Sequence, residues 1–200
     1  MKLQKILNQI INEQNNGLVL YHCSPYNFDK FDTANIGKGT GRQDNGWGFY
    51  FSTNPESIKS YGKYMYEVTL KGEDLTFIDF KEPVPKDIVS KIVESVYKLY
   101  NKDFDINEFN SYYNYVKDKS LPKVEFNDFE LIEFDYSGFL FYRTLSRTLN
   151  SDKKASLFLL DNGIVGIKNK SDYIIFDTDI INIKNKYKIN PDSLSGIYSI

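Results

Sequence analysis

An aromatic stretch held between glycines is the part of the sequence best suited to bind a flat ligand. Residues 46–52 read Gly-Trp-Gly-Phe-Tyr-Phe-Ser, and a second tyrosine, Tyr61, follows them. Glycine has no side chain to exclude a ligand, so the backbone can approach one closely at Gly46 and Gly48. We expect Tyr50 and Tyr61 to face one cleft and to sandwich an aromatic ring. The alternative is that both are core or boundary residues in a chain with 16 tyrosines.

Two short elements must position these tyrosines. Residues 49–51 are β-favouring aromatics and predict a strand that ends at a Ser-Thr-Asn-Pro turn. Pro55 suits the first turn of a helix over residues 56–61, with residue 52, 53 or 54 as its N-cap. We expect that helix to end near Gly62.

The only histidine, His22, follows an apolar strand predicted over residues 18–21. Side chains at strand ends commonly line sites, although a structural role is the alternative for a lone histidine. Near the other end of the sequence, residues 163–167 and 172–177 predict two strands joined by a polar turn. Asp172 opens the second strand, where it is either a functional carboxylate or a solvated residue.

In this order, the three elements resemble the ADP-ribosyltransferase superfamily, in its histidine-tyrosine-acid branch. That branch includes poly(ADP-ribose) polymerases and diphtheria toxin, and small domains of phage and mobile-element polyvalent proteins look most similar. Tyr21-His22-Cys23-Ser24 matches the first motif, residues 46–51 with Tyr61 match the second, and residues 172–177 match the third. The resemblance covers roughly residues 18–80 and 153–184.

The resemblance implies that NAD is the substrate and that no metal takes part. The catalytic residues would be Asp172, His22 and Tyr50. The donor contacts it implies fall on His22, Cys23, Ser24, Tyr50, Phe51 and Tyr61. The nicotinamide ring would stack between the two tyrosines, His22 would bind the adenosine ribose, and the charge of Asp172 would stabilise an oxocarbenium-like centre.

The sequence departs from the family pattern at three positions. Cys23 stands where the family has Gly, although the family uses only the backbone there. Asp172 replaces the Glu of the best-known members and reaches about 1.5 Å less far. Ile58 replaces a Ser found in many polymerase-like members.

A loop over residues 28–45 interleaves three glycines with cations. It lacks the Gly-Lys-Ser/Thr ending of a phosphate-binding P-loop. We expect Arg42 in this loop to contact the pyrophosphate of the donor, and a surface loop without contacts is the alternative.

The remaining segments predict a framework for these motifs. The chain has 200 residues, 41% of them hydrophobic, and suits one domain over residues 1–200. An amphipathic helix is expected over residues 2–14 and two strands joined by a turn over residues 65–79. A helical insertion is expected over residues 83–161, with a helix from 153 to 160 that stops at Gly163. Within it, the Arg143 and Arg147 pair is expected to be a solvated face rather than a substrate clamp. The tail from residue 184 is polar and is expected to pack loosely.

Composition limits the partners. A net charge of −2 gives no field for nonspecific nucleic-acid binding, and no apolar run is long enough for a membrane span. A single cysteine favours a reducing, cytoplasmic location.

We therefore expect an α+β fold in which split antiparallel sheets form an NAD cleft and carry an inserted helical region. The expected activity is mono-ADP-ribosyl transfer to a protein, RNA or DNA acceptor. A toxin or phage-conflict role, with an antitoxin or immunity partner, follows from the resemblance alone. The alternatives are NAD glycohydrolysis and an inactive NAD- or nucleotide-binding module; RNA 2′-phosphotransfer would need more basic residues in the core.

Overall fold

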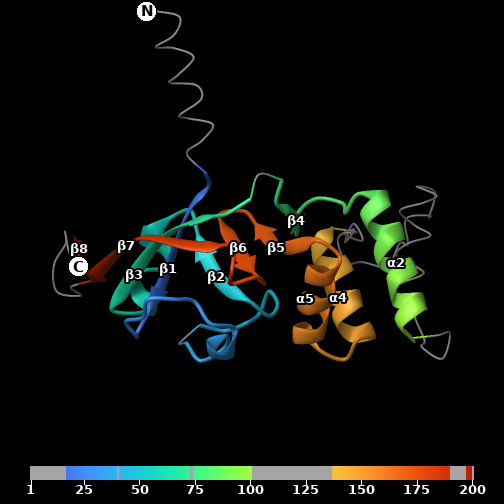
Figure 1. Cartoon of the computed structure of the whole chain (residues 1–200), viewed down its shortest axis with the longest axis horizontal. Coiled ribbons are helices and arrows are strands. Elements are labelled where there is room, and N and C mark those ends of the chain that lie inside the picture. The colour runs from blue at the N-terminus through green and yellow to red at the C-terminus, as the bar shows by residue number, and fades with distance from the viewer. Residues whose placement is uncertain (1–16, 40, 73, 101–136, 190–196, 200) are drawn as a thin grey trace, which may run out of the picture. The chain divides into compact units, whose positions relative to one another are not determined.

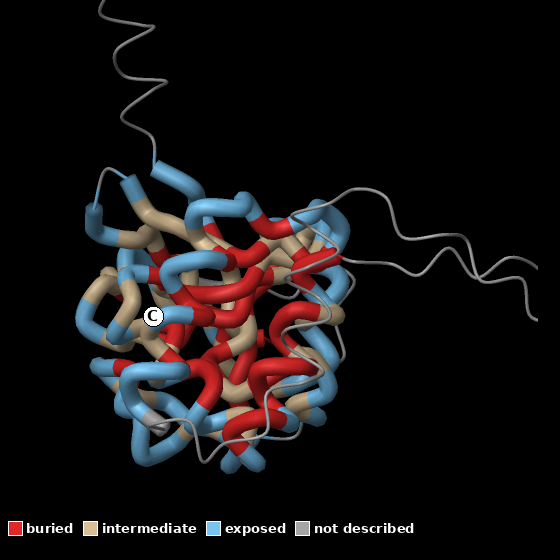
Figure 2. The backbone as a smooth tube through the Cα atoms, turned by 90° about the vertical axis from the view of Figure 1, so that its right-hand side faces the viewer, coloured by how far each residue is buried: buried red, intermediate tan, exposed pale blue. Residues whose placement is uncertain are grey.

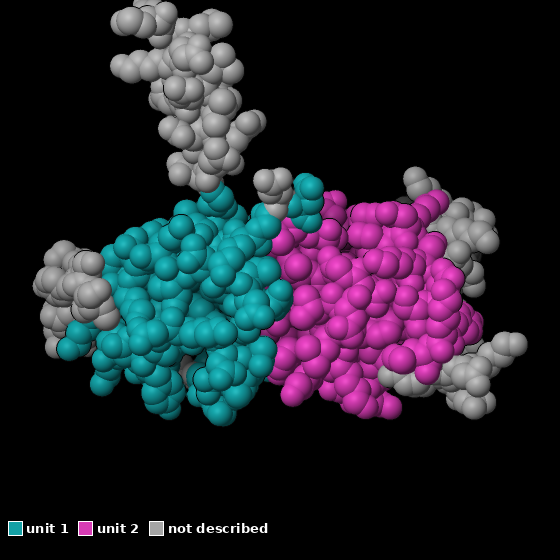
Figure 3. Space-filling view, viewed as in Figure 1, with its two compact units in different colours: residues 1–43, 49–74, 177–200 teal, residues 44–48, 75–176 magenta. Residues whose placement is uncertain are grey.

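The strands and helices of the chain divide between two units in the computed structural model (Figure 3). The structure describes residues 17–39, 41–72, 74–100, 137–189 and 197–199. Unit 1 comprises residues 1–43, 49–74 and 177–200, and unit 2 comprises residues 44–48 and 75–176. The elements confirm the α+β class (Figure 1), whereas the expectation of a single domain remains a prediction. The expected helix over residues 2–14 lies outside the described residues.

Unit 1 contains an antiparallel group of strands in the order β2-β1-β3-β7-β8. Their bounds are β1 Val19–Ser24, β2 Phe49–Ser52, β3 Tyr64–Leu70, β7 Ile181–Ile189 and β8 Ile197–Ser199. Short 3₁₀ turns complete the unit: η1 Thr33–Asn35, η2 Pro55–Ser57 and η3 Lys59–Tyr61.

Unit 2 combines three strands with three helices in its described part. The strands are β4 Thr76–Asp79, β5 Ile164–Asn169 and β6 Asp172–Ile175, and the helices are α2 Lys86–Tyr100, α4 Gly138–Thr148 and α5 Asp152–Asp161. Strand β5 pairs parallel to β4 and antiparallel to β6, and α4 packs against α5 (Figure 1). The parallel pair corrects the expectation of antiparallel sheets alone. It arises because the intervening chain, which includes the helices, returns to the sheet as a crossover.

The cores follow the hydrophobic pattern of each element. Buried residues occur along the strands and on one face of α4 and α5. Figure 2 shows the buried backbone in red and the exposed backbone in pale blue. In unit 1, Leu20, Phe51 and Tyr66 are almost fully buried, and in unit 2, Tyr142 and Leu145 are fully buried. No helix among the described residues is both long and apolar enough to cross a bilayer.

Several expected elements are confirmed, with two differences. The strand over residues 18–21 extends to Ser24, so His22 lies within a strand rather than after it. The strands β3 and β4 exist, but they do not form a hairpin: β3 pairs with β1 and β7, and β4 pairs with β5. The middle region is helical where described, and α5 stops at Gly163 with φ 87°, as expected.

The polar tail was expected to pack loosely, and that expectation is wrong for residues 184–189. They belong to β7, which pairs with β3 on one side and with β8 on the other. Lysines and asparagines alternate there with Ile183, Tyr187 and Ile189, and this period of two is that of a strand with one face turned to the core.

Candidate functional site

His22 joins β1 to β2 through its side chain. The two strands pair at Tyr21 and Ser52. An antiparallel ladder would place Cys23 opposite Tyr50 at the next pairing position, two residues along each strand. Near that expected Cys23–Tyr50 pair, the side chain of His22 reaches the main chain of β2, and its Nδ1 lies 2.8 Å from the Tyr50 carbonyl oxygen. The imidazole therefore caps a main-chain acceptor and links the first and second sequence motifs.

An aromatic cluster surrounds the imidazole. Five rings surround that of His22, and we call the six residues together the aromatic cluster: His22, Phe28, Phe31, Phe49, Phe51 and Tyr66. The ring centroids of Phe31 and Phe51 lie 5.2 and 5.5 Å from that of His22. Burial among these rings lowers the pKa of His22 below its ordinary value of 6.5, and the bond to the Tyr50 carbonyl opposes this shift only in part. The histidine is therefore neutral at pH 7.

The bond to Tyr50 also fixes the tautomer of His22. A carbonyl oxygen only accepts hydrogen bonds, so Nδ1 carries the proton. In the neutral ring, Nε2 then carries the lone pair and can accept a hydrogen bond from a ligand hydroxyl. One imidazole can thus serve the fold with one nitrogen and a ligand with the other.

Tyr50 and the segment that carries Tyr61 lie on one side of the β1–β2 pair, and the His22 ring lies on the other side. Phe49 and Phe51 both contact the His22 ring, so Tyr50, between them, points to the opposite face of its strand. Cys23, next to His22, also points to that face. Its Sγ lies 3.7 Å from the carbonyl oxygen of Lys59, the first residue of η3, and 3.6 Å from that of Gly62, which follows the last residue of η3, Tyr61.

Tyr50 is half-buried and Tyr61 is 49% exposed. The segment that carries Tyr61 is not the expected helix. It forms the turns η2 and η3, because a run of six residues is too short to stabilise an α-helical nucleus and 3₁₀ turns suit short pieces. The expected cap is confirmed, since the Asn54 side chain accepts from the backbone N–H of Glu56 and Pro55 occupies the first position.

Gly62 ends this segment for a reason other than the one expected. Its φ of 179° is extended backbone rather than the left-handed conformation of a helix stop. A Cβ at Gly62 would overlap the main-chain carbonyl of Ser24. The glycine is therefore required for the close approach of the Tyr61 segment to the end of β1.

Cys23 and Ser24 are both buried beside this contact. Burial raises the pKa of the Cys23 thiol from 9.0 to about 11, against the smaller opposing effect of its backbone hydrogen bonds. Such a thiol is protonated and unreactive at neutral pH. Ser24 Oγ accepts from the backbone N–H of Tyr26 at 3.1 Å, so its hydroxyl shapes the turn after β1.

Arg42 is exposed, in the loop over residues 28–45 that begins at Phe28 of the aromatic cluster. That loop is anchored at its start, because Phe28 stacks on Tyr66 with ring centroids 4.2 Å apart. The Tyr66 hydroxyl accepts from the Phe28 backbone N–H at 2.8 Å and donates to the Tyr26 carbonyl at 3.0 Å. Sequence reasoning missed Tyr66 as an anchor, and its only signal was its place in an aromatic-rich strand.

Asp172 is the first residue of β6 and lies in unit 2, whereas the other predicted site residues lie in unit 1. It pairs with Asn169 across a two-residue turn in which Lys170 has φ 57°. Its carboxylate is partly exposed and accepts from Ser171 Oγ at 3.2 Å. The expected pair of strands with Asp172 at the start of the second is confirmed, and its role remains a prediction.

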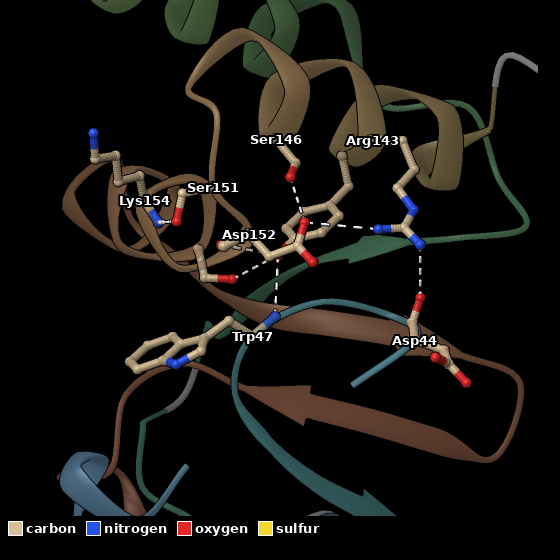
Figure 4. A network of polar contacts seen from close by, with 9 residues as sticks. Asp44, Trp47, Arg143, Ser146, Ser151, Asp152 and Lys154 are labelled. Carbon is tan, nitrogen blue, oxygen red and sulfur yellow. Dashed lines mark hydrogen bonds and ion pairs between the residues drawn. The ribbon is translucent and has the colours of Figure 1, made fainter. Parts of the chain in front are cut away.

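A polar network in unit 2 holds the glycine-tryptophan-glycine segment that precedes β2 (Figure 4). The Trp47 backbone N–H donates to the Tyr142 hydroxyl at 3.2 Å, and Arg143 Nη2 donates to the Asp44 carbonyl at 2.9 Å. Arg143 Nη1 also lies 3.7 Å from an Asp152 carboxylate oxygen. Arg143 thus binds protein groups, while Arg147 is exposed. Sequence reasoning missed this network, because Tyr142 and Trp47 lie 95 residues apart.

The described residues form no candidate metal site, and the sequence is without a recognisable relative among the known proteins compared with it. No cluster of three or more His, Cys, Asp or Glu side chains suited to a metal ion is present among the described residues. The chain matches no protein-family model, and neither a curated protein nor a solved structure is significantly similar to it.

Proposed function

We propose that the protein transfers ADP-ribose from NAD to a macromolecular acceptor, as a mono-ADP-ribosyltransferase with the corresponding split-sheet fold. The observation that carries the proposal is the 2.8 Å bond from His22 Nδ1 to the Tyr50 carbonyl. It joins the two motifs that the resemblance assigns to the donor and leaves Nε2 as a hydrogen-bond acceptor.

His22 would bind the adenosine ribose through Nε2, from the face of the β1–β2 pair opposite to the Tyr50 side chain. A ribose hydroxyl donates to an acceptor nitrogen, and the lowered pKa keeps the imidazole in the form that accepts. A protonated imidazole would carry a second N–H and would lose this bond. The surrounding rings thus hold the histidine in the state that the proposed contact needs.

Tyr50 and Tyr61 would hold the nicotinamide ring. Tyr50 and the η3 segment that carries Tyr61 lie on the face of the β1–β2 pair that carries Cys23. The ring of a nicotinamide nucleotide is cationic, so it is attracted to an aromatic face. The main chain of Cys23 would bond the carboxamide, next to Ser24 and Phe51 of the two motifs. Arg42 would contact the pyrophosphate from its exposed loop.

Asp172 would stabilise the reacting centre. The bond from ribose C1′ to the nicotinamide nitrogen breaks, and its electron pair neutralises the positive charge of the pyridinium ring. C1′ becomes oxocarbenium-like, and a carboxylate on the 2′-hydroxyl lowers the energy of that charge. An acceptor nucleophile then bonds to C1′ and releases its proton to solvent.

The test uses NAD labelled in its adenylate half, incubated with the full chain and a cell lysate. Label on protein, RNA or DNA supports transfer; free ADP-ribose alone indicates glycohydrolysis; binding without nicotinamide release indicates an inactive module. A toxin role with an antitoxin or immunity partner would show as growth arrest on expression that depends on turnover.

Substitutions assign the acid. Asp172→Asn keeps the size and the acceptor oxygen for Ser171 and removes the charge, so it should abolish nicotinamide release from a folded protein. Asp177→Asn is the matched control, because the Asp177 side chain accepts from the Asp179 backbone N–H and an asparagine oxygen can replace it. Full activity in Asp172→Asn, with loss in Asp177→Asn, would move the role to Asp177.

A further inference from the structure

The Tyr142 hydroxyl uses its full hydrogen-bonding capacity on the segment and helix around it. Tyr142 is fully buried, and its hydroxyl lies 3.2 Å from the Trp47 backbone nitrogen, 3.1 Å from the Asp152 carbonyl and 2.9 Å from Ser156 Oγ. The carbonyl can only accept, so it takes the single tyrosine proton. Trp47 and Ser156 must then donate to the two lone pairs.

The backbone of residues 44–48 packs directly against this hydroxyl, with no room for a side chain at Gly46. Gly46 has φ 117°, and a Cβ there would lie 2.6 Å from the Tyr142 oxygen. Any side chain at Gly46 would therefore push the backbone away from α4. Gly48 is packed as closely, since a Cβ there would lie 2.8 Å from the Ile175 carbonyl oxygen.

Two further contacts fix the segment at its start and middle. Arg143, next to Tyr142 on α4, donates to the Asp44 carbonyl at 2.9 Å. Lys153 Nζ lies 5.4 Å above the Trp47 ring, within the range of a cation–π contact (Figure 4 shows the Trp47 side chain and Arg143). Helices α4 and α5 thus hold residues 44, 46 and 47, directly before β2 and Tyr50 begin.

We propose that Tyr142 and Arg143 are positioning residues for the donor site, which they influence by fixing the segment of residues 44–48 that leads into β2. The inference rests on the proposed function for the role of Tyr50. It gives the helical insertion a specific task, because its helices α4 and α5 set the backbone of the second motif.

The chain offers a direct probe of this segment, because Trp47 is its only tryptophan. Acrylamide quenching of tryptophan fluorescence therefore reports on residues 44–48 without any need for activity. The variants are Tyr142→Phe, which removes the hydroxyl, and Arg143→Gln, a milder change at a side chain 35% exposed. Val96→Ala in α2 is the control, since it removes buried methyl groups without touching the segment.

In the folded full chain, we expect acrylamide to quench the Trp47 fluorescence of both variants more readily than that of the wild type. Quenching in Val96→Ala should equal that in the wild type. A misplaced stacking residue lowers kcat/KM by about ten- to hundred-fold, so both variants should show that loss for NAD, mainly through a raised KM. Gly46→Ala should reproduce the effect from the other side of the contact.

The two proposals fail in different ways. Quenching in Tyr142→Phe and Arg143→Gln that equals that of the wild type would overturn the positioning inference. Increased quenching with KM and kcat for NAD equal to those of Val96→Ala would overturn its donor-site part. A wild-type chain that neither binds nor consumes NAD would overturn the proposed function and that donor-site part, and the quenching result would still decide whether α4 fixes the segment.

Discussion

His22 donates from Nδ1 to the carbonyl oxygen of Tyr50 across a distance of 2.8 Å. A side chain here does what a backbone N–H would do in a regular ladder. Nδ1 of His22 therefore has a structural role, and this role does not depend on what Nε2 binds. The two alternatives for a lone histidine, a structural role and a functional one, are compatible in this residue.

Two substitutions separate these roles. His22→Asn places an amide nitrogen near the position of Nδ1 and has nothing at the position of Nε2, while His22→Phe removes both. We expect His22→Phe to lower the free energy of unfolding by about 1–3 kcal/mol, because the Tyr50 carbonyl loses its donor. His22→Asn should unfold at higher urea concentration than His22→Phe and should still raise the KM for NAD. Equal urea midpoints would show that the bond contributes nothing to stability.

The pKa of His22 predicts a pH dependence of stability. The folded state lowers this pKa below 6.5, so the unfolded chain binds a proton more readily as the pH falls. The stabilisation is fully present above pH 6.5 and is lost as the pH falls from 6.5 through the folded-state pKa. Urea unfolding at pH 7.5, 6.5 and 5.5 measures it. His22→Asn lacks this titration and controls for carboxylates, since no other histidine is present. A wild-type slope equal to that of the variant would contradict the prediction.

The single cysteine is predicted to be unreactive until the protein unfolds. At pH 8, a thiol of pKa about 11 holds about a hundred-fold less thiolate than one at its ordinary value of 9.0. The native chain should therefore react with a disulfide reagent at least about a hundred-fold more slowly than the chain in urea. Equal rates would place Cys23 at the surface.

Gly62 is predicted to tolerate no side chain. Gly62→Ala would force a methyl group against the Ser24 carbonyl and should cost about 1–3 kcal/mol in the free energy of unfolding. Gly39→Ala is the matched control, because no atom lies within 4 Å of a Cβ there, and its effect should be within about 0.5 kcal/mol. Thermal unfolding compares them, and similar midpoints would show that the two segments can separate without cost.

Local pattern predicted much of the secondary structure. The aromatic run predicted β2, the expected helical insertion is confirmed by α2 and α4, and Asn54 with Pro55 correctly marked the start of a turn of helix. Each of these depends on residues that are neighbours in sequence. The parallel pairing of β4 with β5 was not predictable in this way, because strand partners are chosen by contacts distant in sequence.

The candidate site was predictable in residue types and not in contacts. The residue types of His22 and Tyr50 marked them as candidates, yet the bond between them ends on a backbone carbonyl, which every residue has. The same holds for Tyr142, whose partners include the main chain of Trp47 and Asp152. Sequence identifies a side chain that can donate, but only the fold selects the carbonyl that accepts.

Tyr66 provides the last prediction, because it anchors the chain between β1 and the Arg42 loop. Its hydroxyl binds the Phe28 N–H and the Tyr26 carbonyl, and its ring lies parallel to that of Phe28 at an interplanar angle of 11°. Tyr66→Phe keeps the stacked ring and leaves two backbone groups without this partner, at a cost of about 1–3 kcal/mol. Hydrogen exchange should therefore quicken at residues 26–28 more than in β3 itself. Tyr26→Phe is the control, since the Tyr26 ring is 64% exposed and only its main chain binds Tyr66. Unchanged exchange at residues 26–28 in Tyr66→Phe would mean that ring packing alone holds the loop.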